Sequence, residues 1–308
     1  MKIIFFGTPD FAIPSLTLLN ESNHEIVAVV TTPDKKSGRG LKIKKPPVKI
    51  VAESIPCDII QPNDFKDDNF LLELKKHAPD LFIVVAFKKL PNEVLSIPIH
   101  GSINLHASLL PKYRGAAPIY HAILNGEAQS GITTFMIESK IDTGMILLQE
   151  KCKISSSMNA GELHDKLSQK GASLLLKTID KIKAKTISPQ IQNHLLSTKA
   201  PKIKKNDQII NWNSNSSDIH NQIRALSPYP GAITMLNDKK IKIYSSKVIN
   251  DSSIIIAPGL IKINSQKLYV GTKNGSIQIN EIQFEGKNKL TVDKFINGQK
   301  HINGIKFG

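Results

Sequence analysis

The sequence predicts an α/β protein in which a Rossmann-like, mostly parallel sheet domain is followed by a small OB-like β-barrel domain. In the first half of the chain, short apolar runs alternate with helical patterns, which is typical of a parallel sheet covered by helices. From Ile233 onward, short β-branched runs are separated by Gly, Asn and Asp, which is typical of a small antiparallel barrel or sandwich. A length of 308 residues fits two domains.

The first domain opens with an apolar run over residues 2–7, which ends in a glycine turn and is followed by a helical pattern through Leu16 and Leu19. No GxGxxG follows this strand, so the dinucleotide-binding fingerprint is absent. We still expect a site beyond the carboxyl ends of the strands, because ligands of open α/β sheets bind there. The remaining expected strands and helices lie around residues 25–31, 48–53, 58–60, 70–77 and 81–87.

A long amphipathic helix is expected over residues 161–185, where leucines recur at helical spacing. The stretch after it has weak periodicity and carries prolines and lysines, which fits a linker. We therefore expect a first domain over residues 1–187, a linker over 188–207 and a β-barrel domain over 208–308.

The chain carries a formal net charge of +15 and should attract polyanions such as nucleic acid or anionic lipid. Residues 201–308 contain 16 basic against 7 acidic residues, so the basic excess is concentrated in the last third. A lysine-biased composition is the alternative explanation, because 38 of the 41 basic residues are Lys.

Secreted, membrane-spanning and zinc-binding proteins are not expected. The first apolar run is interrupted at Gly7 and Pro9, and the longest one, Leu81–Phe87, is far shorter than the ~20 residues of a membrane helix. We expect a cytoplasmic protein. Cys57 and Cys152 are the only cysteines and have no metal-ligand spacing, so neither a disulfide framework nor a zinc site is expected.

The segment NLHASLLPKYRGAAP, residues 104–118, carries candidate chemistry. In an extended strand Asn104 and His106 point to the same side, because side chains alternate. Asn can donate to a developing oxyanion and His can accept a proton near neutral pH, which suits acyl transfer. A histidine with a purely structural role is the alternative. Pro118 is expected in the first turn of the following helix.

A third candidate, Asp142, lies in the sequence IDTG between two β-type runs at 131–137 and 145–149. A buried loop carboxylate could orient His106 and hold it as the useful tautomer. An Asx turn stabilised by Gly144 is the alternative.

The segment NLHASLLPKYRGAAP, followed at this separation by IDTG, resembles the 10-formyltetrahydrofolate-dependent formyltransferase family. The resemblance implies that Asn104, His106 and Asp142 are catalytic. No metal is expected, because the formamide carbon of such a donor is already activated and the sequence offers no ligand cluster. It places the folate site at Ser108, Leu109, Leu110 and Pro111, and implies that backbone near Phe87 and Ile141 lines the pteridine pocket.

Three further stretches, FFGTPDFAIPSL, TTPDKKSGRGLKIKKPPVK and RALSPYPGA, resemble the members of the family that formylate methionine carried by initiator tRNA for translation initiation. The resemblance covers essentially the whole chain. It makes residues 1–187 the catalytic domain and residues 208–308 a tRNA-binding domain. The implied partners are 10-formyltetrahydrofolate and methionyl-initiator tRNA, and we expect a monomer.

The stretch from Thr32 to Lys49 is rich in lysine and holds two glycines, which predicts a flexible basic loop at the same sheet edge as the site. A solvated surface loop is the alternative. By resemblance, the loop enters the acceptor arm of the tRNA, and the expected contacts are Arg39, Lys42, Lys44 and Lys45.

The sequence leaves two points open, the role of Arg114 and the molecule that accepts the formyl group. Arg114 can bind a phosphate or fix the turn before Gly115. The Asn, His and Asp set also fits a formyltransferase acting on a nucleotide-linked amino sugar or on glycinamide ribonucleotide. An RNA-binding protein with a vestigial catalytic domain is the rival from a different class. The basic loop and the second domain favour tRNA.

Overall fold

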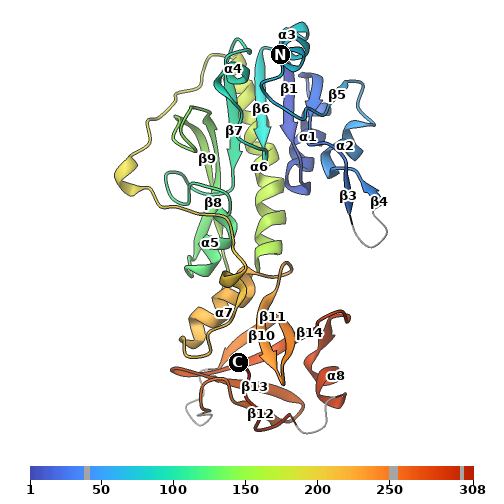
Figure 1. The fold of residues 1–308 in the computed structure, drawn as a ribbon. Coiled ribbons are helices and arrows are strands. Elements are labelled where there is room, and N and C mark those ends of the chain that lie inside the picture. The colour runs from blue at the N-terminus through green and yellow to red at the C-terminus, as the bar shows by residue number, and fades with distance from the viewer. Residues whose placement is uncertain (38–41, 250–255, 299–301) are drawn as a thin grey trace. The chain divides into compact units, whose positions relative to one another are not determined.

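The computed structural model describes residues 1–37, 42–249, 256–298 and 302–308, which form two compact units (Figure 1). The predicted fold class is confirmed, because a mostly parallel sheet with helices is followed by an antiparallel β domain. The first unit comprises Met1–Gly115, Ser130–Cys152 and His164–Lys199, and the second comprises Ala116–Gln129, Lys153–Leu163 and Ala200–Gly308. The chain thus passes between the units several times, and the expected domains 1–187 and 208–308 stay a prediction.

The first unit is built on a seven-stranded sheet with the order β5-β2-β1-β6-β7-β8-β9. The first five of these strands pair in parallel and β8 is antiparallel to β7. The strands are β1 (Lys2–Gly7), β2 (Glu25–Val30), β5 (Asp58–Ile60), β6 (Leu81–Val85), β7 (Ser102–His106), β8 (Gln129–Met136) and β9 (Ile146–Lys153). The helical segments are η1 (Asp10–Ala12), α1 (Ile13–Asn20), α2 (Pro47–Ala52), α3 (Asp68–Lys76), α4 (Asn92–Leu95), α6 (Ala160–Lys183), which begins in the second unit, and η2 (His194–Leu196).

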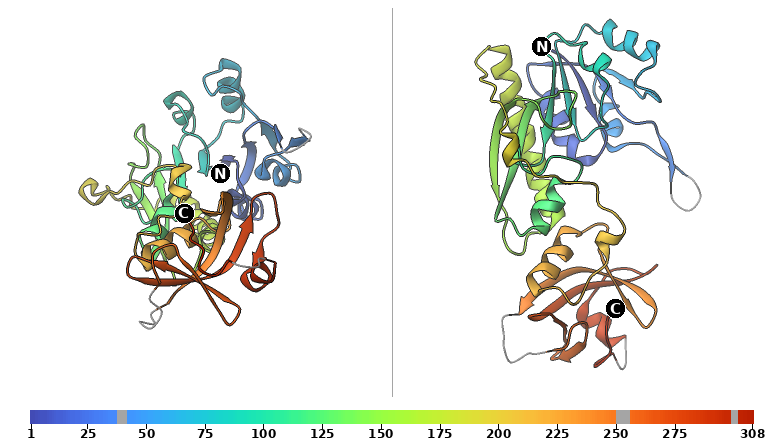
Figure 2. Two further views of the ribbon diagram at one scale, coloured as in Figure 1. Left: turned by 60° about the horizontal axis from the view of Figure 1, so that its bottom comes forward. Right: turned by 60° about the vertical axis from the view of Figure 1, so that its left-hand side comes forward.

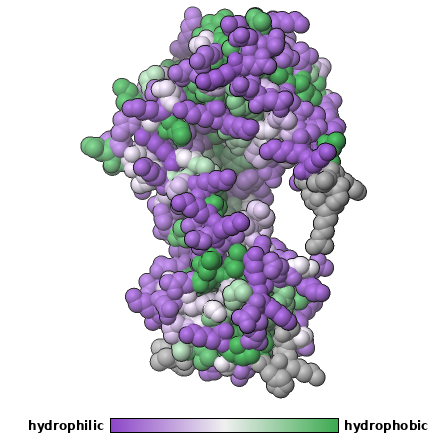
Figure 3. All heavy atoms as spheres, viewed as in Figure 1, coloured by the Kyte–Doolittle hydropathy of each residue, from purple (hydrophilic) through white to green (hydrophobic). Residues whose placement is uncertain are grey.

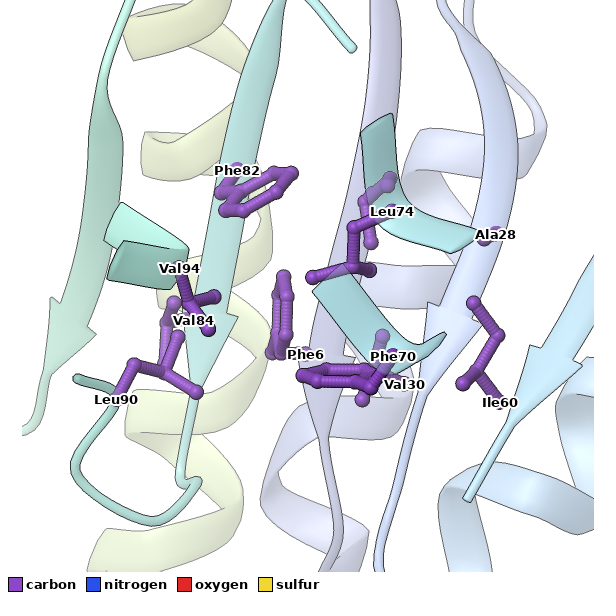
Figure 4. Packing of buried hydrophobic residues seen from close by; sticks show 11 residues of the cluster. Phe6, Ala28, Val30, Ile60, Phe70, Leu74, Phe82, Val84, Leu90 and Val94 are labelled. Atoms are coloured by element: carbon purple, nitrogen blue, oxygen red, sulfur yellow. The ribbon is translucent and has the colours of Figure 1, made fainter. Parts of the chain in front are cut away.

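The central strands are apolar because both of their faces are buried. On one face, Phe6 of β1 packs against Phe82 of β6 with ring centroids 4.9 Å apart, and Phe70 and Leu74 of α3 cover them. Figure 4 shows this cluster between the strands and helices α3 and α4. A continuous apolar run such as β6 is the pattern expected for a strand covered on both sides.

Helix α6 covers the opposite face and was predicted at nearly the same bounds (Figures 1 and 2). Gly171 allows a close approach, because a Cβ there would lie 2.7 Å from the Leu105 side chain and 2.9 Å from that of Ile132. The hydroxyls of Thr178 and Thr134 lie 2.8 Å apart in the same buried layer. The helix therefore packs directly on β7 and β8, the strands that border the candidate site.

The basic stretch is only partly the loop that its sequence predicted. Strands β3 (Lys35–Ser37) and β4 (Lys42–Lys44) pair antiparallel in a small two-stranded sheet. Lys35 lies opposite Lys44 and Lys36 lies opposite Ile43. The described ends of the stretch thus form a two-stranded ladder, and Pro46 precedes α2.

The second unit is an antiparallel sheet with the order β10-β11-β14-β13-β12, and β15 pairs with β14. The C-terminal segment joins the two edge strands, because Ile305 O accepts from Ile261 N and Gly308 N donates to Met235 O. Its strands are β10 (Ala232–Leu236), β11 (Lys239–Ile249), β12 (Ile261–Asn264), β13 (Lys267–Thr272), β14 (Gly275–Phe284) and β15 (Leu290–Thr291). Its helical segments are α5 (Pro118–Leu124), η3 (Asn206–Gln208), α7 (Ser216–Ala225) and α8 (Val292–Asn297).

Most of the expected β runs of the second unit are strands in the structure. The run SIIIAPG is the exception, because residues 250–255 lie outside the described part of the chain. Pro118 occupies the first turn of α5, as expected. Within the described residues, no helix is long and apolar enough to cross a membrane.

Phe6→Ala should lower the free energy of unfolding by about 3–5 kcal/mol, because it leaves a cavity in the two-sided core. Leu72→Ala on α3 is the matched control, since Leu72 is 63% exposed and its loss should change stability by no more than about 0.5 kcal/mol. Urea unfolding of both variants measures this. Equal stability of Phe6→Ala and the parent would contradict the role of the cluster.

Candidate active site

The candidate site lies where β1, β6 and β7 end at the same edge of the sheet. The parallel register pairs Gly7 with Val85 and Val85 with Leu105, so the three strands end side by side. His106 is the last residue of β7. The site thus lies where ligands of open α/β sheets bind, as the sequence predicted.

Asn104 and His106 project from the same side of β7 but differ in what surrounds them. His106 is 6% exposed, whereas Asn104 is half-buried. Within the described residues, the Asn104 carboxamide makes no hydrogen bond. A half-buried carboxamide without a partner beside a buried imidazole leaves its N–H groups available to a bound molecule.

The backbone of Tyr113 fixes the protonation of the His106 ring. His106 Nε2 lies 2.9 Å from the carbonyl oxygen of Tyr113, and a carbonyl can only accept, so Nε2 carries a hydrogen. In the neutral imidazole Nδ1 then has a free lone pair. It faces Asp142 Oδ2 at 3.8 Å, which is beyond hydrogen-bond distance. Tyr113 therefore selects the tautomer, a role that the sequence suggested for Asp142.

Asp142 sits in a left-handed backbone conformation with φ +54°. Its Oδ2 accepts a hydrogen bond of 2.8 Å from the backbone N–H of Gly115. The side-chain amide of Gln192 donates to the carbonyl oxygens of Asp142 and Gly144. The structure thus brings all three predicted catalytic residues to one edge. It adds Tyr113, which lies in the segment NLHASLLPKYRGAAP but had no predicted role, and Gln192, which lies outside every motif quoted above.

The segment Ser108–Pro111 is held from inside the first unit. Ser108 Oγ donates to Lys112 O at 2.6 Å, and Leu110 N donates to Thr133 Oγ1 at 3.2 Å. Gln149 Nε2 donates to Leu110 O at 2.9 Å. Ser108 and Leu110 are buried, so their side chains shape this loop, whereas Leu109 is half-buried.

Phe87 and Ile141 lie on the loops next to the strand ends. The Phe87 ring is partly buried and packs against the rings of Phe6 and Phe65, with centroids 5.7 Å from each, so its side chain lies against the core. Ile141 is 61% exposed and directly precedes Asp142. For Phe87 and Ile141, the backbone N–H and C=O groups are therefore the candidates for ligand binding.

Of the four basic residues predicted to contact tRNA, the structure describes the side chains of two, Lys44 and Lys45. Arg39 lies outside the described residues, and the side chain of Lys42 is not described. Lys44 is exposed and has no ion-pair partner among the described residues. Lys45 Nζ lies 2.7 Å from Glu53 Oε1, and this hydrogen bond raises the pKa of Lys45. Figure 3 shows hydrophilic side chains over most of the visible face.

A second ion pair anchors the base of the basic stretch. Lys49 Nζ donates to Asp34 Oδ2 at 2.8 Å and to Gln61 Oε1 at 2.7 Å. Hydrogen bonds from Gln61 and Lys49 lower the pKa of Asp34. Across the residues that the structure describes, no group of three or more His, Cys, Asp or Glu is placed to hold a metal ion.

Residues 1–179 match the family described as formyl transferase, and residues 202–300 match the formyl transferase C-terminal domain. The methionyl-tRNA formyltransferase of Thermodesulfovibrio yellowstonii is 47% identical over 304 residues, which cover 98% of this chain and 97% of the relative.

Two solved structures share the fold. The methionyl-tRNA formyltransferase from Clostridium thermocellum superposes with a TM-score of 0.56 at 18% identity, covering 82% of this chain and 95% of that one. An N-formyltransferase from Helicobacter canadensis, in complex with folinic acid and dTDP-3-aminofucose, gives a TM-score of 0.67 at 23% identity, covering 91% and 98%. At these identities the similarity shows the fold alone.

Gly144→Ala should destabilise the first unit by about 1–3 kcal/mol, because an added Cβ would overlap the backbone carbonyl of Met136. Gly298→Ala is the control, since its φ is −87° and its nearest neighbour would lie 3.6 Å away. Thermal unfolding measures both. A Gly144→Ala variant as stable as the control would show that the turn can move freely.

Proposed function

The chain belongs to the formyl transferase family, and we propose that it transfers the formyl group of 10-formyltetrahydrofolate to the α-amino group of methionyl-initiator tRNA. The observation that carries the proposal is the 47% identity to a methionyl-tRNA formyltransferase over nearly the full length of both chains. The geometry of Asn104, His106 and Asp142 supports it independently. The reaction serves translation initiation in the cytoplasm, and the chain acts as a monomer.

The residues at the sheet edge fit a formamide donor. The donor supplies an activated formyl carbon, and the neutral amine of the acceptor attacks it. The new bond joins the amine nitrogen to that carbon, the bond to N10 of the folate breaks, and one amine proton ends on N10. The unpartnered carboxamide of Asn104 donates to the oxygen that gains negative charge.

His106 and Asp142 assist the transfer of the amine proton to the departing nitrogen. Because Tyr113 holds the hydrogen of Nε2, His106 can take a proton only at Nδ1. Once protonated there, the ring presents an N–H toward Asp142 Oδ2, which lies 3.8 Å away in the free protein. Such distances commonly shorten when substrate binds. Asp142 thereby stabilises the imidazolium, and His106 returns the proton to the departing nitrogen.

The proposed folate-binding residues lie at the same edge of the sheet. Ser108, Leu109, Leu110 and Pro111 form one wall, and backbone near Phe87 and Ile141 offers donors and acceptors to the pteridine. Thr133 and Gln149 support this wall by hydrogen bonds to Leu110. The chemistry needs no metal, because the formyl carbon is already activated.

The β3–β4 hairpin supports the tRNA proposal by its charge. Lys35 and Lys44 lie directly opposite each other on the two strands, where like charges repel. A phosphate between them would relieve this repulsion and release counterions. Arg39, Lys42, Lys44 and Lys45 are the proposed tRNA contacts, and Lys45 would exchange Glu53 for a phosphate.

Asn104→Ala should lower kcat by about 10²–10³-fold with little change in KM, because it removes one donor to the oxyanion. Single-turnover transfer of labelled formyl from 10-formyltetrahydrofolate to methionyl-initiator tRNA measures this. His106→Ala should abolish transfer. Near-normal turnover of Asn104→Ala would refute its role.

The acceptor is tested by running dTDP-3-aminofucose beside methionyl-initiator tRNA at the same donor concentration. We expect transfer to the tRNA alone, because the basic hairpin suits a polyanion. Transfer to the sugar alone would keep the catalytic assignment and overturn the acceptor. Transfer to neither would overturn the proposed activity.

Lys35→Ala combined with Lys44→Ala should raise KM for the tRNA and leave folate binding unchanged. The slope of log affinity against log salt should fall by about 1 for each lost phosphate contact. Lys75→Ala is the control, because Lys75 is exposed on α3, outside the hairpin. Equal tRNA kinetics and salt slopes in the double variant and the parent would exclude the hairpin from binding.

A further inference from the structure

Residues 190–199, which the sequence predicted as part of a linker, are bound to both loops that shape the active site. We call them the strap. We propose that Gln192 of the strap is a positioning residue, which holds the turn of Asp142 so that its carboxylate faces His106. The proposal rests on the proposed function for the identity of the reaction.

Gln192 is 3% exposed, and its amide is fully engaged. Its Nε2 donates to Asp142 O at 3.0 Å and to Gly144 O at 2.7 Å. Its Oε1 accepts from Arg114 Nε at 3.1 Å and from Arg114 Nη2 at 2.5 Å. The partners also fix the orientation of the amide, because carbonyls only accept and a guanidinium only donates. The two N–H groups and the oxygen of this one amide thus join three segments of the chain: the strap, the loop of Arg114 and the turn of Asp142.

The turn depends on such outside support. Asp142 has φ +54°, a left-handed conformation that Asp tolerates better than most residues other than glycine but that still costs free energy, which contacts with the surroundings offset. The Gly115 N–H holds the carboxylate, whereas Gln192 holds the backbone on either side of Thr143. Without the Gln192 amide, the carbonyls of Asp142 and Gly144 lose this hydrogen-bond donor, and the backbone that carries the Asp142 carboxylate is no longer held in place. The 3.8 Å approach to His106 would then no longer be held.

Arg114 completes the support and closes an alternative left open by the sequence. Its Nη2 also lies 2.9 Å from His194 Nδ1, so the guanidinium is shared between two strap residues. Burial lowers the pKa of Arg114, with the charge of Asp142 acting in the opposite direction. These contacts favour fixing the turn over binding a phosphate.

The strap supports the second loop as well. Tyr113 N donates to Thr198 Oγ1 at 2.8 Å, and Arg114 N donates to Thr198 O at 2.9 Å. Tyr113 is the residue whose carbonyl selects the tautomer of His106. Gln190 pairs with Ile146 through two backbone hydrogen bonds of 2.8 Å, which anchor the other end of the strap. Gln192 lies between these two anchors.

Gln192→Glu is the sharpest variant. It keeps the size of the side chain and the bonds from Arg114, but it replaces the donor to Asp142 and Gly144 by a carboxylate oxygen that repels their carbonyls. We expect kcat to fall by about 10²-fold, as for a small misplacement of a catalytic group, with KM for both substrates little changed. Gln190→Ala is the matched control, since its side chain is exposed and its pairing uses backbone atoms only.

A double-mutant cycle that combines Gln192→Glu with Asp142→Asn separates a positioning role from a merely structural one. If Gln192 acts through Asp142, adding Gln192→Glu to Asp142→Asn should lower kcat no further. Fully multiplicative losses in the double variant would overturn the proposal. Equal kcat in Gln192→Glu and Gln190→Ala would overturn it too.

A readout without turnover keeps this inference distinct from the proposed function. Amide exchange of Gly115, whose N–H binds the Asp142 carboxylate, should be at least about tenfold faster in Gln192→Glu, because the acceptor is displaced. Exchange of the Tyr113 amide, which Thr198 holds, should be unchanged. An unchanged Gly115 rate would overturn the positioning role. A lack of formyl transfer in the parent would overturn the proposed function only.

Discussion

Two-sided burial of β1, β6 and β7 is the constraint on which the site depends. Phe6 and Phe82 pack under α3 on one face, and Leu105 packs under α6 on the other. Strands packed on both faces cannot slip freely, since a shift of one residue would place every side chain in a space of the wrong shape in a close-packed interior. His106 at the end of β7 therefore has a fixed place at the sheet edge.

Backbone groups, more than side chains, organise the reacting residues. The carbonyl of Tyr113 sets the tautomer of His106, and the N–H of Gly115 holds the carboxylate of Asp142. Preorganised groups of this kind need no rearrangement during the reaction, which is the main source of electrostatic catalysis. The proposed role of Gln192 extends this scheme, because its amide supports the backbone that carries Asp142.

The charges of the basic stretch fall into two groups. Lys45 and Lys49 are paired with Glu53 and Asp34, and they stabilise the connection between the hairpin and α2. Lys35 and Lys44 face each other without such partners in the described part of the chain. Lys49 thus suits a structural role, whereas Lys35 and Lys44 suit a polyanionic partner that supplies the missing negative charge. In the proposed complex Lys45 joins them by exchanging Glu53 for a phosphate.

The sequence by itself determined the alternation of strands and helices, the place of Asn104 and His106 on one face of a strand, and the loop position of Asp142. These follow from local periodicity and short motifs. Tertiary structure alone decided the tautomer of His106, the engagement of Gln192 by Arg114, and the joining of β10 and β12 by the C-terminal segment. Gln192 and Arg114 are 78 residues apart, and no local pattern encodes which distant donor meets which carbonyl, because that choice is made by the packing of the whole unit.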